Sequence, residues 1–211
     1  MLPRLYVVCD ADVCACGGWR LTDFAAACLD GGARLLQIRA KRAASKALLA
    51  DTRVIVDLAH HAGAAVIVND RADIARLAGA DGVHVGQEDL SAVAVRAIVG
   101  SAAIVGLSTH TPEQIEAAAR EPISYLAVGP VFGTETKTTG YQAVGLNLVA
   151  RAASSGAAHG IPVVAIGGIT LDRAPEVIAA GAASVAVISD LLAGGDPAAR
   201  VAAYVDRLSR V

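Results

Sequence analysis

Short apolar runs rich in Val, Ile, Leu and Ala recur along the chain, each followed by polar residues and then by apolar positions at helical spacing. The apolar runs predict eight strands, at residues 5–9, 35–39, 65–69, 82–85, 104–107, 124–129, 163–167 and 184–188. The amphipathic stretches predict helices at about residues 21–31, 43–62, 71–78, 90–99, 111–120, 144–156, 172–180 and 196–209. Strands and helices therefore alternate from one end of the chain to the other.

Glycine stands between most predicted helices and the strand that follows, as in Gly63-Ala64 and Gly181-Ala182. A glycine after a helix ends it in the left-handed conformation and turns the chain toward the next strand. Eight such units predict a (β/α)8 TIM barrel, a single domain over residues 1–211 whose closed sheet leaves no strand edge unpaired. The alternative is an open doubly wound sheet, which would usually carry a dinucleotide fingerprint or a Walker loop, and neither is present.

Composition narrows the functional classes. The chain is 55% hydrophobic but only 3% aromatic, which suits buried parallel strands covered by alanine-rich helices. Its net charge of −2 gives no reason to expect a nucleic-acid or membrane partner. No apolar run reaches the roughly 18 residues that span a bilayer, and the N-terminus has no signal-peptide pattern. We expect a cytoplasmic protein acting on small molecules, and exposed alanine-rich helices permit a monomer or a homodimer.

The cysteines all fall in the first predicted β/α unit, at Cys9, Cys14, Cys16 and Cys28. No Cys-x-x-Cys pair or nearby histidine supports a metal site, so reduced thiols are favoured. The segment 11–19 that contains two of them is expected to be an irregular loop over the barrel mouth.

The second predicted strand ends in alternating polar and apolar residues. Period-two alternation places Gln37, Arg39 and Lys41 on one face, with Leu36 and Ile38 on the other, toward the helices. Because active sites of such barrels lie at the carboxyl ends of the strands, the two cations and the amide predict an anion site in the mouth. A solvated strand end would also tolerate these charges.

Two carboxylates follow neighbouring strands, Asp70 after the third and Asp89 after the fourth. Either carboxylate alone reads equally well as a helix N-cap. Together at one end of the sheet they would repel each other unless a cation lay between them. Two carboxylates plus substrate phosphates are a common Mg²⁺ arrangement, so the pattern leaves magnesium and capping both open.

The loop 128–140 carries the densest potential anion-binding chemistry. Its glycines at 129, 133 and 140 allow close approach of backbone to ligand, and Thr134, Thr136 and Lys137 are residue types that hold phosphate oxygens. The alternative is a surface loop rich in turn formers.

Three further strand ends carry expected ligand contacts. After the fifth strand, Ser108 is the expected ligand contact, whereas Thr111 is expected to cap a helix and His110 to be structural. Gly167-Gly168 after the seventh strand and Ile188-Ser189 after the eighth lie where these barrels often bind phosphate, although a simple tight turn would have the same glycines. The chain thus predicts one site for a diphosphate and another for a monophosphate.

The chain resembles the thiamine phosphate synthase family. Six motifs, in chain order over essentially the whole sequence, carry the resemblance: Gln37-x-Arg39-x-Lys41, Asn69-Asp70, Gly86-Gln87-Glu88-Asp89-Leu90, Ser108-Thr109-His110, Gly129-Pro130-Val131-Phe132-x-Thr134-x-Thr136-Lys137 and Ile166-Gly167-Gly168-Ile169. Each is weak alone, but the ordered set is specific. The resemblance implies that a pyrimidine diphosphate loses pyrophosphate and its methylene joins a thiazole phosphate, plain or carboxylated, by a dissociative Mg²⁺-dependent mechanism.

The resemblance also implies roles for individual residues. Those implied to act in catalysis are Arg39, Lys41, Lys137 and Ser108. Those implied to bind the pyrimidine diphosphate are Gln37, Ile38, Arg39, Ala40, Lys41, Asn69, Ser108 and Lys137. Those implied to bind the thiazole phosphate are Thr134, Glu135, Thr136, Gly167, Gly168, Ile188 and Ser189. The implied Mg²⁺ ligands are Asp70 and Asp89.

Two features depart from the family pattern, the cysteine-rich segment 11–19 and Asp190, where a small residue is more usual. We expect Asp190 to cap the next short helix instead of facing the phosphate. Three rival functions remain. A thiazole tautomerase-like relative would not need the diphosphate site, a phosphosugar isomerase or lyase would need an inward acid–base pair, and a non-catalytic regulator would keep costly charges without turnover.

Overall fold

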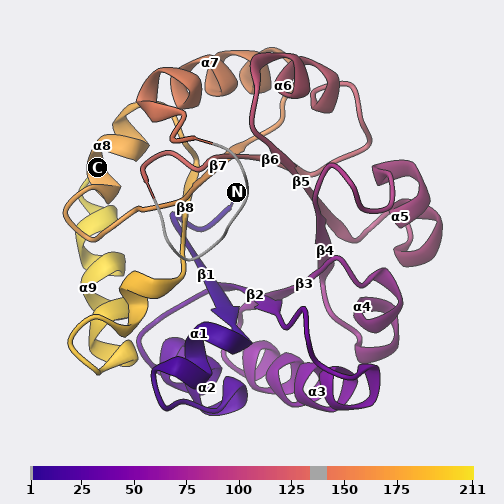
Figure 1. The fold of residues 1–211 in the computed structure, drawn as a ribbon, viewed down its shortest axis with the longest axis vertical. Helices are drawn as coiled ribbons and strands as arrows, with labels where there is room; N and C mark the ends of the chain where they lie inside the picture. Colours follow the sequence, from indigo (N-terminus) through magenta and orange to yellow (C-terminus); the bar gives the residue numbers. More distant parts are fainter. Residues whose placement is uncertain (1, 134–141) are drawn as a thin grey trace.

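Eight parallel strands close into a barrel in sequence order, with β1 paired to both β2 and β8 (Figure 1). The computed structural model describes residues 2–133 and 142–211. The strands are β1 Leu5–Asp10, β2 Leu35–Arg39, β3 Ala65–Asn69, β4 Gly82–Val85, β5 Ile104–Thr109, β6 Tyr125–Val128, β7 Val163–Ile166 and β8 Ser184–Val187. The closed barrel is confirmed, and the open doubly wound sheet is wrong.

Helices surround the barrel as an outer ring (Figure 1). They are α1 Ala11–Cys16, α2 Leu21–Asp30, α3 Ser45–His61, α4 Ala72–Ala78, α5 Ala92–Val99, α6 Pro112–Ala118, α7 Gly145–Ala158, α8 Ala174–Ala179, the 3₁₀ helix η1 Ser189–Leu192 and α9 Pro197–Ser209. None of the helices in the described ranges is long and apolar enough to cross a membrane.

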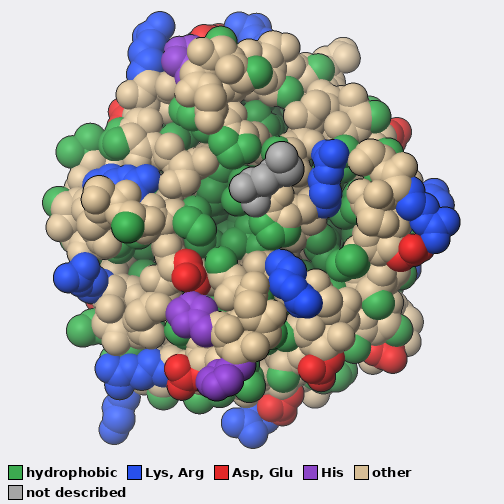
Figure 2. Space-filling model, turned by 180° about the vertical axis from the view of Figure 1, so that it is seen from behind, with side chains coloured by type: hydrophobic (Ala, Val, Ile, Leu, Met, Phe, Trp, Pro, Cys, Tyr) green, Lys and Arg blue, Asp and Glu red, His purple; other side chains and the backbone are tan. Residues whose placement is uncertain are grey.

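The core has two layers, which follow from the alternation of side chains along each strand. A large outer cluster of aliphatic side chains, including Leu36 and Ile38, packs between the strands and the helices. A smaller inner cluster, including Tyr6 and Tyr125, fills the barrel itself. The view from behind shows hydrophobic side chains gathered at the centre of that face and charged side chains spread around it (Figure 2). The predicted outward orientation of Leu36 and Ile38 is confirmed.

The segment after β1 is helical, so the expected irregular loop over residues 11–19 is wrong for most of its length. Asp10, the last residue of β1, is the N-cap of α1, and its Oδ1 accepts hydrogen bonds from the backbone N–H groups of Asp12 and Val13, both at 3.1 Å. A capping carboxylate stabilises even a short helix at this position. The signal was present in the sequence as an aspartate directly after an apolar strand.

The thiols around this helix are not joined in disulfides. All four cysteines are free, with Cys9, Cys14 and Cys28 buried and Cys16 exposed. Burial raises the pKa of the Cys14 thiol to about 12, so it stays protonated at neutral pH. That the thiols are reduced stays a prediction.

Candidate active site

A cavity of about 700 Å³ opens among the loops that follow the strands and extends into the barrel interior. Among the described residues that line it, Tyr6, Gln37 and His84 come from inside the barrel, whereas Gly168 and Ser189 come from the loops after β7 and β8. The wall is more apolar than polar, and its polar groups gather at these two levels. A ligand entering here would meet fixed polar groups at both ends.

A chain of hydrogen bonds forms the polar part of the barrel interior. Gln37 Nε2 donates to Tyr6 Oη at 2.9 Å, and that hydroxyl lies 3.0 Å from Tyr125 Oη. Tyr125 Oη is 2.9 Å from His84 Nδ1, and His84 Nε2 is 2.8 Å from Ser108 Oγ. The chain runs from β2 through β1, β6 and β4 to β5. It therefore fixes two residues that the sequence assigned to the pyrimidine diphosphate, Gln37 and Ser108.

Strand register explains how these side chains meet. His84, Gly106 and Tyr125 are register partners on β4, β5 and β6. A Cβ on Gly106 would lie 2.1 Å from the Tyr125 ring, so only glycine lets this ring pass over β5 and stack on His84, with ring centroids 5.6 Å apart. Burial is the main cause that raises the pKa of both Tyr6 and Tyr125, so these hydroxyls remain neutral donors and acceptors.

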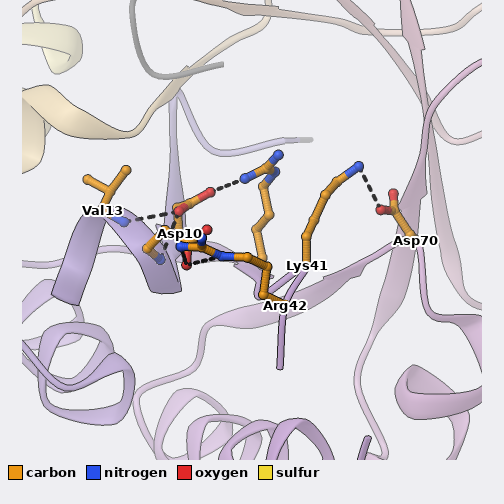
Figure 3. A network of polar contacts seen from close by, with 7 residues as sticks. Asp10, Val13, Lys41, Arg42 and Asp70 are labelled. Carbon is orange, nitrogen blue, oxygen red and sulfur yellow. Dashed lines mark hydrogen bonds and ion pairs between the residues drawn. The ribbon is translucent and has the colours of Figure 1, made fainter. Parts of the chain in front are cut away.

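A second group of charged residues lies at the ends of β2 and β3 (Figure 3). Arg39 and Asp10 are register partners on β2 and β1, and the Arg39 guanidinium pairs with the buried Asp10 carboxylate. Lys41 Nζ lies 3.2 Å from Asp70 Oδ2, on the far side of the same group. Arg39 Nε is buried without a hydrogen-bond partner in the part of the chain that the structure describes. The Arg39 guanidinium is thus largely shielded from solvent, whereas the Lys41 side chain is half exposed.

Asp70 is placed where its own charge is disfavoured. Burial first, and then the charge of Asp89, raise its pKa, and Lys41 opposes this shift. Asp89 accepts a hydrogen bond from the backbone N–H of Gly86 at 2.8 Å, which fixes its carboxylate near Asp70. Neither aspartate is an N-cap, because α4 is preceded by Arg71 and α5 is capped by Ser91. The capping alternative is wrong for both.

The donor set at this position fits a hard divalent cation. No group of three or more His, Cys, Asp or Glu residues among residues 2–133 and 142–211 is placed to hold a metal. The charge of Asp89 raises the pKa of the Asp70 carboxyl, and a cation held by both carboxylates would relieve this repulsion. Mg²⁺ is commonly held by one or two carboxylates, with water and substrate phosphates completing its shell. The pair fits that pattern without a third protein ligand.

The loop after β7 packs against the start of the loop after β6. The backbone N–H groups of Val131 and Phe132 donate to the carbonyls of Ile166 and Gly167 at 2.9 and 3.0 Å. A Cβ on Gly168 would lie 2.6 Å from the Gly133 carbonyl oxygen, so the glycine permits this close approach. The four residues predicted to follow as phosphate contacts lie outside the described residues: Thr134, Glu135, Thr136 and Lys137.

Asp190 does not cap a helix, so that expectation is wrong. Its Oδ2 accepts hydrogen bonds from the backbone N–H of Leu171 at 3.2 Å and from the Tyr204 hydroxyl, and it pairs with Arg200 at 2.7 Å. The carboxylate is therefore neutralised by α9 and ties η1 to the loop after β7. Local sequence pattern does not indicate this arrangement, because the partners of Asp190 lie on other elements.

The structure separates the predicted site residues into two neighbouring groups. Those that line the cavity are Gln37, Ser108, Gly167, Gly168, Ile188 and Ser189. Those in the adjacent charged group are Arg39, Lys41, Asp70 and Asp89. Asn69 ends β3 directly before Asp70, and Ile38 turns its side chain toward the helices, so only its backbone faces the barrel mouth. Sequence reasoning missed Asp10, Tyr6, His84 and Tyr125, which support these groups.

The fold and the site define a (β/α)8-barrel enzyme that acts on small molecules. Residues 5–191 match the family model described as thiamine monophosphate synthase. The thiamine-phosphate synthase of Koribacter versatilis is 43% identical over 212 residues, covering 98% of this chain and 96% of that one, and that of Roseiflexus castenholzii is 42% identical, covering 96% and 86%. The structure of thiamine phosphate pyrophosphorylase from Pyrococcus furiosus superposes with a TM-score of 0.88 at 29% identity, over 98% and 96% of the two chains.

The chain belongs to the thiamine monophosphate synthase family. It is a transferase of thiamine biosynthesis, as the resemblance in its six motifs implied.

Proposed function

We propose that the protein joins a hydroxymethylpyrimidine diphosphate to a thiazole phosphate, releasing pyrophosphate and giving thiamine phosphate. The observation that carries the proposal is the arrangement of the two groups at one barrel mouth. A cavity with polar groups at both ends lies beside a group of two cations and two mutually repelling carboxylates. Such an arrangement suits one uncharged ring system held deep in the barrel and anionic groups held at the rim.

In this proposal the reaction breaks the bond between the pyrimidine methylene carbon and the diphosphate oxygen, and the electron pair leaves with pyrophosphate. The methylene cation is then captured by the thiazole nitrogen, forming the new carbon–nitrogen bond. No side chain has to act as a nucleophile. The protein instead stabilises charge on the departing group and holds the two rings in line.

Arg39 and Lys41 are proposed to hold the departing diphosphate. Asp10 keeps the Arg39 guanidinium in place, so little reorganisation is needed as charge develops. Asp70 and Asp89 would hold Mg²⁺, which supplies charge neutralisation to the diphosphate when it is bound. Gln37, Asn69 and Ser108 would orient the pyrimidine diphosphate, with Ser108 itself held by His84.

The thiazole phosphate is assigned to the opposite end of the cavity, at Gly167, Gly168, Ile188 and Ser189. The start of the loop after β6 is pinned against this turn by backbone hydrogen bonds. From the sequence motif, Thr134, Glu135 and Thr136 would add contacts to the same phosphate, and Lys137 would reach the diphosphate. The four free thiols fit a reducing compartment, so we place the enzyme in the cytoplasm.

The proposal is tested by measuring pyrophosphate release from the purified protein with hydroxymethylpyrimidine diphosphate and thiazole phosphate, in Mg²⁺ and in EDTA. We expect release only when both substrates and the metal are present. Asp70→Asn should remove most of the turnover, whereas Asp206→Asn, which changes an exposed carboxylate paired with Arg210, should not. Binding of both substrates without pyrophosphate release would contradict the proposal and favour a tautomerase-like relative or a regulator.

Lys137 provides a separate test of the assignment from sequence. Because it is proposed to contact the leaving group, Lys137→Ala should lower kcat more than it raises the KM for thiazole phosphate. Steady-state kinetics with each substrate varied in turn would measure both effects. A change confined to the KM for thiazole phosphate would move Lys137 to the acceptor site.

A further inference from the structure

Arg173 stands at the acceptor end of the cavity, and none of the family motifs includes it. It follows the Gly167-Gly168 turn and directly precedes α8. Its Nη1 donates to the Gly168 carbonyl at 3.3 Å, and its guanidinium carbon lies 4.6 Å from the centroid of the Phe132 ring. Among the described residues that line the cavity, it is the only lysine or arginine.

The positive charge of Arg173 is not cancelled by its surroundings. No carboxylate in the described ranges forms an ion pair with it. Asp190 lines the same cavity, but its carboxylate is committed to Arg200 and Tyr204. A guanidinium has five N–H donors, of which one is used on Gly168. An anion at this end of the cavity would therefore meet an available cation.

The guanidinium is also held in place before any ligand arrives. Phe132 supports it by a cation–π contact, and Phe132 is itself fixed by its backbone hydrogen bond to Gly167. The chain just before Arg173 is fixed by the hydrogen bond from Leu171 N–H to Asp190. Holding a long side chain in advance reduces the entropy that it would lose on binding.

We infer that Arg173 binds the phosphate monoester of the acceptor substrate, at the Gly167-Gly168 turn. This inference rests on the proposed function, because it names the cation that the monophosphate site otherwise lacks among the described residues. The planar fork of a guanidinium matches two oxygens of a phosphate. Arg173 thereby becomes a determinant of specificity for a phosphorylated over an unphosphorylated acceptor.

Calorimetric binding of thiazole phosphate and of the unphosphorylated thiazole alcohol separates this role from a structural one. Arg173→Gln keeps an N–H donor for the Gly168 carbonyl but removes the charge. We expect it to weaken binding of the thiazole phosphate about ten- to a hundredfold, the range of a charge-assisted contact. Binding of the alcohol should change by less than about twofold, as should the KM for the pyrimidine diphosphate. Arg120→Ala, at an exposed arginine just after α6, is the matched control.

The outcomes are distinct. Equal weakening of the phosphate and the alcohol would show that Arg173 only shapes the loop, and an unchanged affinity for both would also overturn the inference. Arg173→Lys keeps the charge but not the planar guanidinium. Its affinity for thiazole phosphate should therefore lie between those of the parent and Arg173→Gln. If the parent binds thiazole phosphate through Arg173 but releases no pyrophosphate, the inference stands and the proposed function fails.

Discussion

Asp70 combines an unusual backbone conformation with an unfavourable charge. Its φ of 62° is the one positive value recorded for a non-glycine residue in the described ranges. Aspartate and asparagine tolerate this left-handed region better than most residues. Its carboxylate is partly buried beside Asp89, which raises its pKa. Both features cost stability in the protein without ligands, as is common where a site is prepared for a partner.

The neutral variant Asp70→Asn should therefore be more stable than the parent at neutral pH without Mg²⁺. A carboxyl whose folded pKa is raised destabilises the fold above that pKa. The destabilisation fades as pH falls toward the ordinary value of 3.8. Asparagine keeps the left-handed backbone, and the lost pair with the half-exposed Lys41 is worth little.

Urea unfolding in EDTA, at about pH 7.5 and about pH 4, measures the effect. The free energy of unfolding of Asp70→Asn should exceed that of the parent by more at the higher pH. Asp206→Asn, at an exposed carboxylate, is the control and should change the free energy of unfolding by less than about 0.5 kcal/mol. A variant less stable than its parent at neutral pH would show that the Lys41 pair outweighs the repulsion from Asp89.

His84 should act on turnover through Ser108. Its Nε2 lies 2.8 Å from the serine hydroxyl, so it fixes the direction in which that hydroxyl points. We expect Ser108→Ala and His84→Ala each to lower kcat, and the double variant to be little worse than the poorer single variant. Steady-state kinetics on the parent, the two single variants and the double variant measure how far the effects of His84 and Ser108 on kcat depend on each other. Effects that simply multiply would indicate that His84 serves the site independently of Ser108.

At the scale of the elements, the turn after β7 depends on the close approach of two backbones. Gly168 and Gly160 have nearly the same left-handed φ, 63° and 69°. A Cβ on Gly168 would meet the Gly133 carbonyl at 2.6 Å, whereas nothing lies within 4 Å of a Cβ on Gly160. The two positions therefore share the backbone strain and differ in the contact.

Comparing Gly168→Ala with Gly160→Ala measures the effect of the contact with the Gly133 carbonyl. Gly160→Ala should cost about 1–2 kcal/mol, the penalty of a left-handed alanine. Gly168→Ala should cost about 1–3 kcal/mol more, because the loop after β6 must move, and it should also raise the KM for the acceptor. Urea unfolding and steady-state kinetics measure the two effects. Equal costs and an unchanged KM would mean that the loop adjusts freely.

Local patterns in the sequence predicted the elements well, because a closed parallel barrel repeats one hydrophobic pattern eight times. The period-two alternation at Gln37 and Arg39 correctly indicated which side chains face the barrel. The helix after β1 was missed because the cysteine-rich segment lacks an amphipathic period, although Asp10 caps it. Six residues are too few for that period to be read.

The supporting residues of the site were beyond prediction from local patterns. Asp10 meets Arg39 only because β1 and β2 pair in a particular register. Tyr125 reaches His84 only because Gly106 lies between them. Asp190 finds Arg200 on a helix that packs against η1. Each contact depends on how distant elements are placed, which a hydrophobic pattern does not specify.

At the scale of the whole molecule, two tyrosines join opposite sides of the barrel. Tyr6 on β1 and Tyr125 on β6 are 119 residues apart in sequence, and their hydroxyls lie 3.0 Å apart in the inner core. The rings meet edge to face, with centroids 5.9 Å apart. Since strands β1 and β6 are not neighbours in the sheet, this contact crosses the barrel interior.

Tyr6→Phe and Tyr125→Phe should each cost about 1–3 kcal/mol of unfolding free energy, because each leaves a buried polar partner unsatisfied. The partners are Gln37 in the first case and His84 in the second. The double variant should cost less than the sum, since either substitution alone already breaks the bond between the hydroxyls. Burial raises the pKa of both tyrosines, so ionisation of their hydroxyls should leave these costs the same between about pH 7.5 and pH 9. Urea unfolding of the four proteins at both pH values tests this, and strict additivity would show that the hydroxyls do not support each other across the barrel.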